Sequence, residues 1–264
     1  MRPFVARHAI LLLSFLGGIH LALSQPAQVF REHVLGGIVR TDLSKKEICL
    51  VFTGHEFADG GVTIRNTLKK HDVRASFFFT GDFYRNPAFS QLIRDLIQDG
   101  HSLGGHSDKH LLYASWGKRD SLLVTKEEFL KDLSANYREL DRFGITKDSA
   151  RFFLPPYEWY NQSISDWCAE WGLTLVNFTP GTYSNADYTY PELGASYVSS
   201  DSILARILRY EESHPNGLNG FILLTHIGSD PRRTDKFYDK LDRLLEGLEQ
   251  KGYKFRLLGE TIRN

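Results

Sequence analysis

The chain has 264 residues, with 32 lysines and arginines against 32 aspartates and glutamates, so its formal net charge at pH 7 is zero. Apolar residues make up 42% and charged residues 24%, a composition typical of a globular protein, which excludes disordered, collagenous and coiled-coil chains. A chain without net positive charge or basic runs has no general attraction for nucleic acid, so we predict no nucleic-acid partner.

The N-terminal segment differs from the rest of the chain. Two arginines precede an apolar run over residues 9–23, which ends in the small-residue pattern of a cleavage site at Ala22-Leu23-Ser24. We therefore expect a signal peptide over residues 1–24, a mature domain over residues 25–264, and export to the periplasm or the extracellular space. An uncleaved anchor is the alternative. No later apolar run is long enough to span a membrane, and no protein partner is implied.

Short apolar runs alternate with patterns of amphipathic helices along the mature chain. The predicted strands are residues 48–53, 74–80, 101–103, 151–154, 173–178, 220–225 and 254–258. Between most of them apolar side chains recur at helical spacing, and Thr125 with Glu128 forms a capping box ahead of one predicted helix. This alternation predicts a parallel sheet covered by helices. About seven such units suggest an α/β barrel, whose functional residues lie at the carboxyl ends of the strands.

The chain has two cysteines. Cys49 lies in the first predicted strand and Cys168 on a helical pattern, and neither has the spacing of a metal site. We predict two separately buried thiols. A disulfide between them in an oxidising compartment is the alternative.

Titratable side chains follow several of the predicted strands. His55, Glu56 and Asp59 come after the first strand, and His106 and His110 come after the third. If the second segment makes one helical turn, the four-residue spacing points both imidazoles the same way, as two ligands of one metal ion require. Two histidines and one carboxylate, with an open coordination position, form a hydrolytic metal site. The pattern predicts one divalent metal ion at the barrel mouth.

The order of these motifs resembles that of the polysaccharide deacetylases with a NodB-type domain, carbohydrate esterase family 4. The family motif T-F-D-D-G is matched loosely by Thr53-Gly54-His55-Glu56, and G-H-x-x-G-x-H-S/T-x-x-H is matched fully by residues 100–110. R-P-P-Y-G appears as Leu154-Pro155-Pro156-Tyr157-Glu158, and L-x-H as Leu224-Thr225-His226. The resemblance spans roughly residues 47–258 and implies a distorted (β/α)7 barrel.

The resemblance also implies a divalent metal ion, usually zinc, held by Asp-His-His. On this chain the ligands would be His106 and His110, with Glu56 at the carboxylate position. A water bound to the metal would be the nucleophile. The backbone N–H of Tyr157 would help to bind the oxyanion, and Leu224 would line the acetyl pocket.

The resemblance assigns the general acid to His226. A histidine of ordinary pKa can hold and release a proton near neutral pH, and an amine leaves badly unless it is protonated. In the family an Asp-Trp pair braces this histidine. That pair has no clear match here, and Asp187-Tyr188 is the stand-in.

The family's general base and the arginine that orients it are both replaced in this chain. The family has an aspartate general base just before the metal-binding acid, and an arginine that hydrogen-bonds this base; here these residues are His55 and Leu154. The changes make sense together, because an arginine that orients a carboxylate loses its purpose without it. Three substitutes stay open: Glu56 as base with His55 as ligand, His55 as base, or Asp59 reaching back in either role. We prefer Glu56 as the ligand.

The segment over residues 179–200 is long for a barrel loop. It carries four tyrosines, at Tyr183, Tyr188, Tyr190 and Tyr197. Long loops at the active face are commonly functional, and tyrosine offers a flat apolar ring with a polar tip that suits a sugar. Phe57, Trp159 and Tyr160 could extend this wall as substrate contacts. The alternative is that these aromatic side chains only hold the loop in place.

These features predict an exported, zinc-dependent hydrolase that removes acetyl groups, N-acetyl in the leading hypothesis, from a glycan. One alternative is a catalytically impaired, glycan-binding relative of the deacetylases, and another is an acetyl-ester hydrolase of the acetylxylan type. A glycosidase that uses Glu56 with Asp59 or Glu158 as a carboxylate pair is a further alternative. It would leave His106 and His110 without a purpose.

Overall fold

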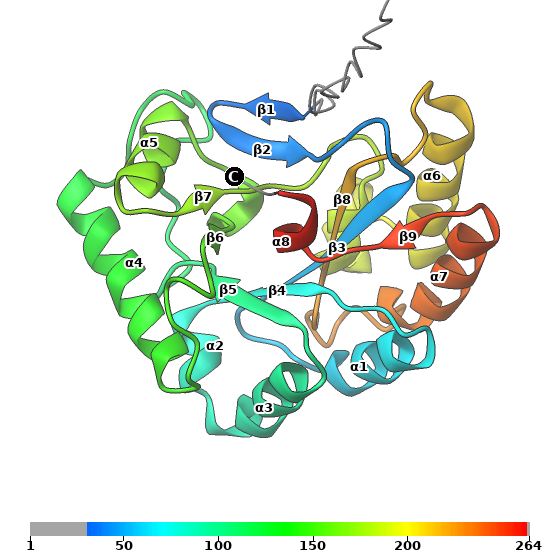
Figure 1. Cartoon of the computed structure of the whole chain (residues 1–264), viewed down its shortest axis with the longest axis horizontal. Coiled ribbons are helices and arrows are strands. Elements are labelled where there is room, and N and C mark those ends of the chain that lie inside the picture. The colour runs from blue at the N-terminus through cyan, green and yellow to red at the C-terminus, as the bar shows by residue number, and fades with distance from the viewer. Residues whose placement is uncertain (1–30, 263–264) are drawn as a thin grey trace, which may run out of the picture.

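A sheet of mainly parallel strands, curved into a barrel, lies at the centre of the molecule, and helices cover its outside (Figure 1). The structure is a computed structural model that describes residues 31–262. The signal peptide predicted over residues 1–24 lies outside the described residues. Within the described part, no helix is both long and apolar enough to cross a membrane.

The strands of the sheet follow the order β1-β2-β8-β3-β4-β5-β6-β7, and β9 pairs with β3. Their bounds are Glu32–Val34 (β1), Gly37–Arg40 (β2), Glu47–Gly54 (β3), Ser76–Phe79 (β4), Ser102–Gly105 (β5), Phe152–Phe153 (β6), Thr174–Leu175 (β7), Phe221–His226 (β8) and Lys254–Phe255 (β9). Strand β3 pairs in parallel with β4 and β8, and parallel pairing continues through β5 and β6 to β7. The carboxyl ends of these strands therefore meet on one side of the barrel.

The barrel closes through the segment that follows β7. A bridge joins Ile38 of β2 to Val176, and the backbone N–H of Asn177 donates to the carbonyl of Ile38 at 2.9 Å. Two residues later, the N–H of Thr179 donates to the carbonyl of Ile222 in β8 at 3.0 Å. Strand β2 is itself antiparallel to β8, so the ring from β2 to β8 is a distorted barrel.

The seven predicted strands coincide with β3 to β9, but the last of them does not join the ring. Strand β9 pairs only with the start of β3, and the rest of the predicted strand begins the short helix α8 (Leu258–Thr261). Its place is taken by β2, from an N-terminal hairpin that the sequence analysis did not predict. The hairpin was missed because its first strand is exposed and only three residues long.

Helices follow most of the strands and pack around the barrel (Figure 1). Their bounds are Gly61–Lys70 (α1), Gly81–Arg85 (α2), Ser90–Gln98 (α3), Lys126–Asp141 (α4), Gln162–Glu170 (α5), Ser200–Ser213 (α6) and Leu241–Gln250 (α7). The predicted capping box is confirmed: the Thr125 side chain accepts from the N–H of Glu128, whose carboxylate accepts from the N–H of Thr125.

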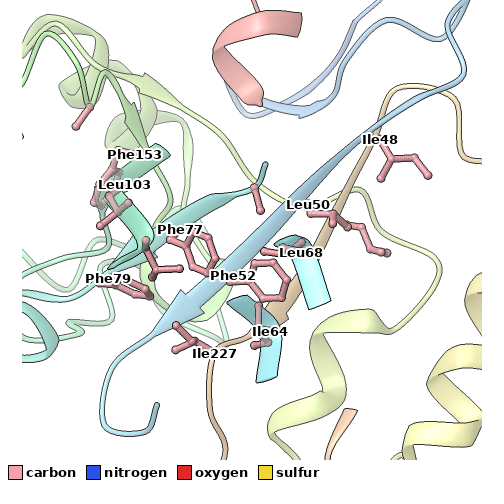
Figure 2. Packing of buried hydrophobic residues seen from close by; sticks show 14 of the residues in the cluster. Ile48, Leu50, Phe52, Ile64, Leu68, Phe77, Phe79, Leu103, Phe153 and Ile227 are labelled. Atoms are coloured by element: carbon pink, nitrogen blue, oxygen red, sulfur yellow. The ribbon is translucent and has the colours of Figure 1, made fainter. Parts of the chain in front are cut away.

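Strand β3 is buried on both faces, which explains its nearly continuous apolar sequence. Ile48, Leu50 and Phe52 point outward to the helix layer, where Ile64 and Leu68 of α1 pack near them (Figure 2). Alternate residues of the same strand point to the other face and join a second apolar cluster inside the barrel. Cys49 belongs to that inner cluster and Cys168 to the outer one. Both thiols are buried and unpaired, so the prediction of separate thiols is confirmed.

Candidate functional site

A pocket of about 710 Å³ opens where β3 and β8 end. Its titratable lining comes from several strand-end loops and comprises His55, Glu56, His110, Glu158, His226, Asp230 and Arg232. Its aromatic lining comprises Phe57, Trp116, Tyr157, Tyr188 and Tyr190. The polar residues that follow the predicted strands are thus gathered into one concave surface, next to flat rings that suit a sugar.

His110 lines this pocket, and the buried His106 lies next to it, with ring centroids 5.2 Å apart. The Nδ1 of His106 lies 2.7 Å from the carbonyl oxygen of Leu154. Because a carbonyl only accepts, Nδ1 carries the proton and Nε2 keeps its lone pair. Burial lowers the pKa of His106 to about 3 and the pKa of His110 to about 2. Both rings are therefore uncharged near neutral pH.

The two histidines are brought together without the helical turn that we predicted. Residues 106–110 are not helical, and Ser107 and His110 have positive φ angles of 72° and 56°. The loop is held instead by α4: the carboxylate of Asp132 accepts from the backbone N–H groups of Asp108 and Lys109. Tertiary hydrogen bonds therefore set the angle between the imidazoles.

His55, not Glu56, lies against this histidine pair. The His55 ring stacks on the His110 ring, with centroids 4.7 Å apart and planes 8° apart, and its Nδ1 lies 3.1 Å from Thr80 Oγ1. The Glu56 side chain is 66% exposed, with Oε1 3.9 Å from His55 Nε2. The carboxylate that we preferred as the third ligand therefore extends towards solvent in this structure.

The donor chemistry of His106 and His110 fits a divalent ion such as zinc, because both rings are neutral and at least one has a ring nitrogen oriented by a backbone carbonyl. Within residues 31–262, however, no three His, Cys, Asp or Glu side chains stand close enough to hold a metal ion. The histidine pair fits a metal ion, and a third ligand is not in place. The predicted metal ion stays a prediction.

Asp59 does not reach the histidines. Its carboxylate accepts from the backbone N–H of Ser229 at 2.9 Å and from the Tyr238 hydroxyl at 3.0 Å, and it lies 2.8 Å from Lys236 Nζ. Burial alone would raise the pKa of Asp59, but these partners outweigh burial and the pKa is lowered. In this structure the Asp59 carboxylate braces the loop after β8, and its role as base or ligand stays a prediction.

His226, at the end of β8, also lines the pocket. Asp187 Oδ1 lies 2.6 Å from its Nδ1, and Asp187 Oδ2 accepts from its backbone N–H at 2.8 Å. Burial lowers the pKa of His226, but the charge and hydrogen bond of Asp187 outweigh burial, and the pKa is raised. The predicted brace at Asp187 is confirmed by this geometry. With Nδ1 held, Nε2 is the ring nitrogen left to move a proton.

Glu158 lies beside His226 in an uncommon backbone conformation. Tyr157 and Glu158 have consecutive positive φ angles of 59° and 53°, which cost roughly 1–2 kcal/mol per residue for non-glycine residues. The family motif has glycine at the second position. Burial raises the pKa of the Glu158 carboxyl, which contacts the Asn185 side chain and senses the charge of His226. A titratable side chain thus enters the pocket where glycine would leave space.

Tyr157 lies at the centre of the aromatic lining. Its ring packs on His110 with centroids 4.4 Å apart, and its backbone N–H finds no acceptor among the described residues. An N–H of this kind is free to donate to a ligand. Leu224 lies inside the barrel rather than in the pocket lining, so its predicted contact with an acetyl group stays a prediction.

Trp159 is not part of the lining but supports it. Its Nε1 donates to the carbonyl of Ser115 at 3.2 Å, and its ring packs on Trp116 with centroids 5.1 Å apart. Trp116 is 57% exposed and does line the pocket. Trp116 was not predicted as a site residue, although a tryptophan six residues after His110 is visible in the sequence. Tyr160, which we considered for the same wall, is buried and donates to Val34.

The long loop after β7 carries Asp187, which braces His226, and part of the aromatic lining of the pocket. Of its four tyrosines, Tyr188 and Tyr190 line the pocket, and Tyr183 and Tyr197 do not. The fully buried Arg233 holds the loop, since its Nη1 donates to the carbonyls of Thr189 and Val198. This arginine was also missed, because its role depends on packing rather than on a motif.

Comparisons with known proteins agree with this geometry. A family model described as Polysaccharide deacetylase matches residues 41–176. A peptidoglycan-N-acetylglucosamine deacetylase from Bacillus cereus is 23% identical over 212 residues, which cover 80% of this chain and 66% of that protein. The chain therefore spans just under two thirds of the length of this relative.

Two solved structures share the fold. A carbohydrate esterase family 4 pseudoenzyme from Bacillus anthracis matches with a TM-score of 0.66 and 20% identity, over 87% of this chain and 69% of that chain. A family 4 acetyl xylan esterase from Clostridium thermocellum, in complex with a cobalt ion, matches with a TM-score of 0.62 and 20% identity, over 81% of this chain and 89% of that chain. The predicted distorted (β/α)7 barrel is confirmed.

Proposed function

This chain belongs to the polysaccharide deacetylase family, and we propose that it hydrolyses N-acetyl groups of a glycan outside the cytoplasm. The observation that carries the proposal is one pocket that combines a neutral histidine pair, His110 in its lining and His106 next to it, with the carboxylate-braced His226. Amide hydrolysis needs both sides, because the carbonyl must be polarised and the leaving amine must be protonated.

On the first side, His106 and His110 would hold a divalent cation, with Glu56 or His55 as the third ligand. Such a cation supplies a Lewis acid for the acetyl carbonyl and lowers the pKa of water. The chain itself contributes the backbone N–H of Tyr157, which is free to donate to the oxygen of the acetyl group as negative charge develops there.

On the second side, His226 would protonate the leaving nitrogen through Nε2. Asp187 holds Nδ1 and raises the pKa of His226, which favours the protonated ring that a general acid needs. The exposed rings of Trp116 and Tyr188 would contact the sugar on either side of the reacting group.

The proposals of export and of a glycan substrate are supported by the sequence and by a relative rather than by the pocket. The sequence pattern of residues 1–24 favours a secretory signal peptide, and glycans with N-acetyl groups are abundant outside the cytoplasm. The named activity of the Bacillus cereus relative makes peptidoglycan the first substrate to test. Acetyl esters share the chemistry and form a second arm of the test.

The second candidate function is glycan binding without turnover. It is favoured by His55 at the position of the family's aspartate base, and by the missing third ligand within the described residues. The structural neighbour described as a pseudoenzyme shows that this fold also occurs without activity.

One experiment separates the two functions. Metal content and acetate release from chitin oligomers, peptidoglycan fragments and acetylxylan are measured with and without a chelator. We expect about one divalent ion per chain in the wild type and chelator-sensitive acetate release. His106→Ala should lose both, and His33→Ala, an exposed histidine of β1, should keep both. Saturable glycan binding without acetate release would overturn the proposal in favour of binding alone.

A further inference from the structure

The Glu158 carboxyl group lines the pocket without an arginine or lysine partner, and the nearby charge that it senses is that of His226. The lining contains one arginine, Arg232, and no lysine. Arg232 is already committed, since it donates to both carboxylate oxygens of Asp230 at 2.8 and 2.6 Å and stacks on the Tyr190 ring. Among the described residues, no arginine or lysine forms an ion pair with Glu158, and its side chain contacts the amide of Asn185.

The surroundings of Glu158 suit a cation that comes with a sugar. Tyr157 precedes it in the chain, and Tyr188 packs edge-on to His226 with ring centroids 5.6 Å apart. The faces of aromatic rings attract cations as well as apolar sugar faces. A carboxylate beside exposed aromatic rings is therefore a binding site for an ammonium group on a flat, partly apolar molecule.

We propose that Glu158 is a specificity residue that binds the ammonium group of an amino sugar, so that the pocket prefers glycans carrying free amines beside their N-acetylated sugars. This proposal rests on the proposed function for its substrate class and deepens it. A deacetylase produces such amines, so the preference would direct the protein to glycans that are already partly deacetylated.

The position of Glu158 in the chain supports this role. Its backbone has a left-handed conformation that glycine adopts freely, and the Asn177 side chain donates to its carbonyl at 2.8 Å, which holds the turn. A side chain kept at such a position, beside His226 and inside the pocket, is typical of a group that contacts a ligand.

The test measures binding, which needs no turnover. Isothermal titration of the purified protein compares a tetramer of glucosamine with a tetramer of N-acetylglucosamine at low salt, over a pH series from mildly acidic to neutral, because burial raises the pKa of Glu158. We expect the free-amine tetramer to bind about tenfold more tightly, because a hydrogen bond between charged groups in a partly buried site is strong. Added salt should weaken that preference.

Three variants keep the test specific. Glu158→Gln removes the charge but keeps the shape, and should weaken only the free-amine ligand. Glu158→Gly also removes the charge and relieves the positive φ angle, so it covers the case in which the first variant is unstable. Glu127→Gln removes an exposed carboxylate of α4 that lies outside the lining, and should keep the preference.

The outcomes separate this proposal from the proposed function. Equal weakening of both ligands by Glu158→Gln, or an unchanged preference, overturns the role of Glu158. Acetate is assayed in the same samples. A preference that depends on Glu158 without acetate release supports this proposal and contradicts the proposed deacetylation, whereas acetate release without the preference does the reverse.

Discussion

His110 and His226 line the same pocket, yet the pKa values of their rings are shifted in opposite directions. Burial lowers the pKa of His110 to about 2, and its ring packs on His55, His106 and Tyr157 rather than on a carboxylate. His226 is also buried, but Asp187 outweighs burial and raises its pKa. The partner of each ring, rather than its burial, therefore decides what each histidine can do. His110 offers a lone pair, and His226 offers a proton.

The two sides are also built differently. The histidine side comes from one contiguous motif over residues 100–110, folded back by hydrogen bonds to α4. The side with the proposed general acid joins His226, at the end of β8, to Asp187, which lies 39 positions earlier in the chain. Changes to each side should therefore have separable effects.

Loss of a histidine on the neutral side should have the largest effect. His110→Ala removes a ring that would bind the metal ion, so acetate release should fall on the order of a hundredfold or more, beyond the effect typical of changing groups behind the ligands. Metal content by atomic emission should fall in parallel. Normal metal content in this variant would show that His110 is not a ligand.

Loss of the carboxylate on the acid side should come next. Asp187→Asn should lower kcat/KM on the order of a hundredfold, as expected when a general acid is no longer tuned. The acid works when protonated, so activity is present below the pKa of His226 and is lost above it. Removing Asp187 lowers that pKa.

The alkaline limb of the pH profile of Asp187→Asn should therefore move to lower pH, with metal content unchanged. Asp166→Asn, an exposed carboxylate of α5, is the control. An alkaline limb that stays in place would show that Asp187 does not tune the catalytic group.

Loosening the loop that carries Asp187 should have a smaller effect on activity. Arg233→Leu leaves the carbonyls of Thr189 and Val198 without their buried donor, so we expect about 3 kcal/mol less stability in urea unfolding. Activity should fall about tenfold, because the loop holds the acid side. Arg233→Lys keeps the charge and should recover part of the loss. Loss of metal as well would mean that the two sides are not independent.

The smallest expected effect is a change in the pKa of His226 when Glu158 is replaced. Its negative charge raises the pKa of His226 after the larger contribution of Asp187. Glu158→Gln should therefore lower that pKa, but by less than Asp187→Asn does. Titration of labelled histidine by nuclear magnetic resonance measures both shifts without turnover. A shift larger than that of Asp187→Asn would reverse the assigned order.

The sequence could predict the parts of the fold that depend on local patterns. Strands β3, β4 and β8 are apolar because both of their faces are buried, and this leaves a continuous run that is visible without a structure. Hairpin strands β1 and β2 were missed, because one is exposed and both are short. The site followed the same rule: His106, His110 and His226 stand in motifs, whereas Trp116 and Arg233 do not.

By itself the sequence determined the alternation of strands and helices, the order of motifs and the set of side chains at the strand ends, since these depend on residue type and spacing. Only the tertiary structure decided that His55 rather than Glu56 packs on His110, and that Asp59 braces a loop. The physical reason is that charge state and orientation depend on partners distant in the chain, and spacing along the chain carries no information about those partners.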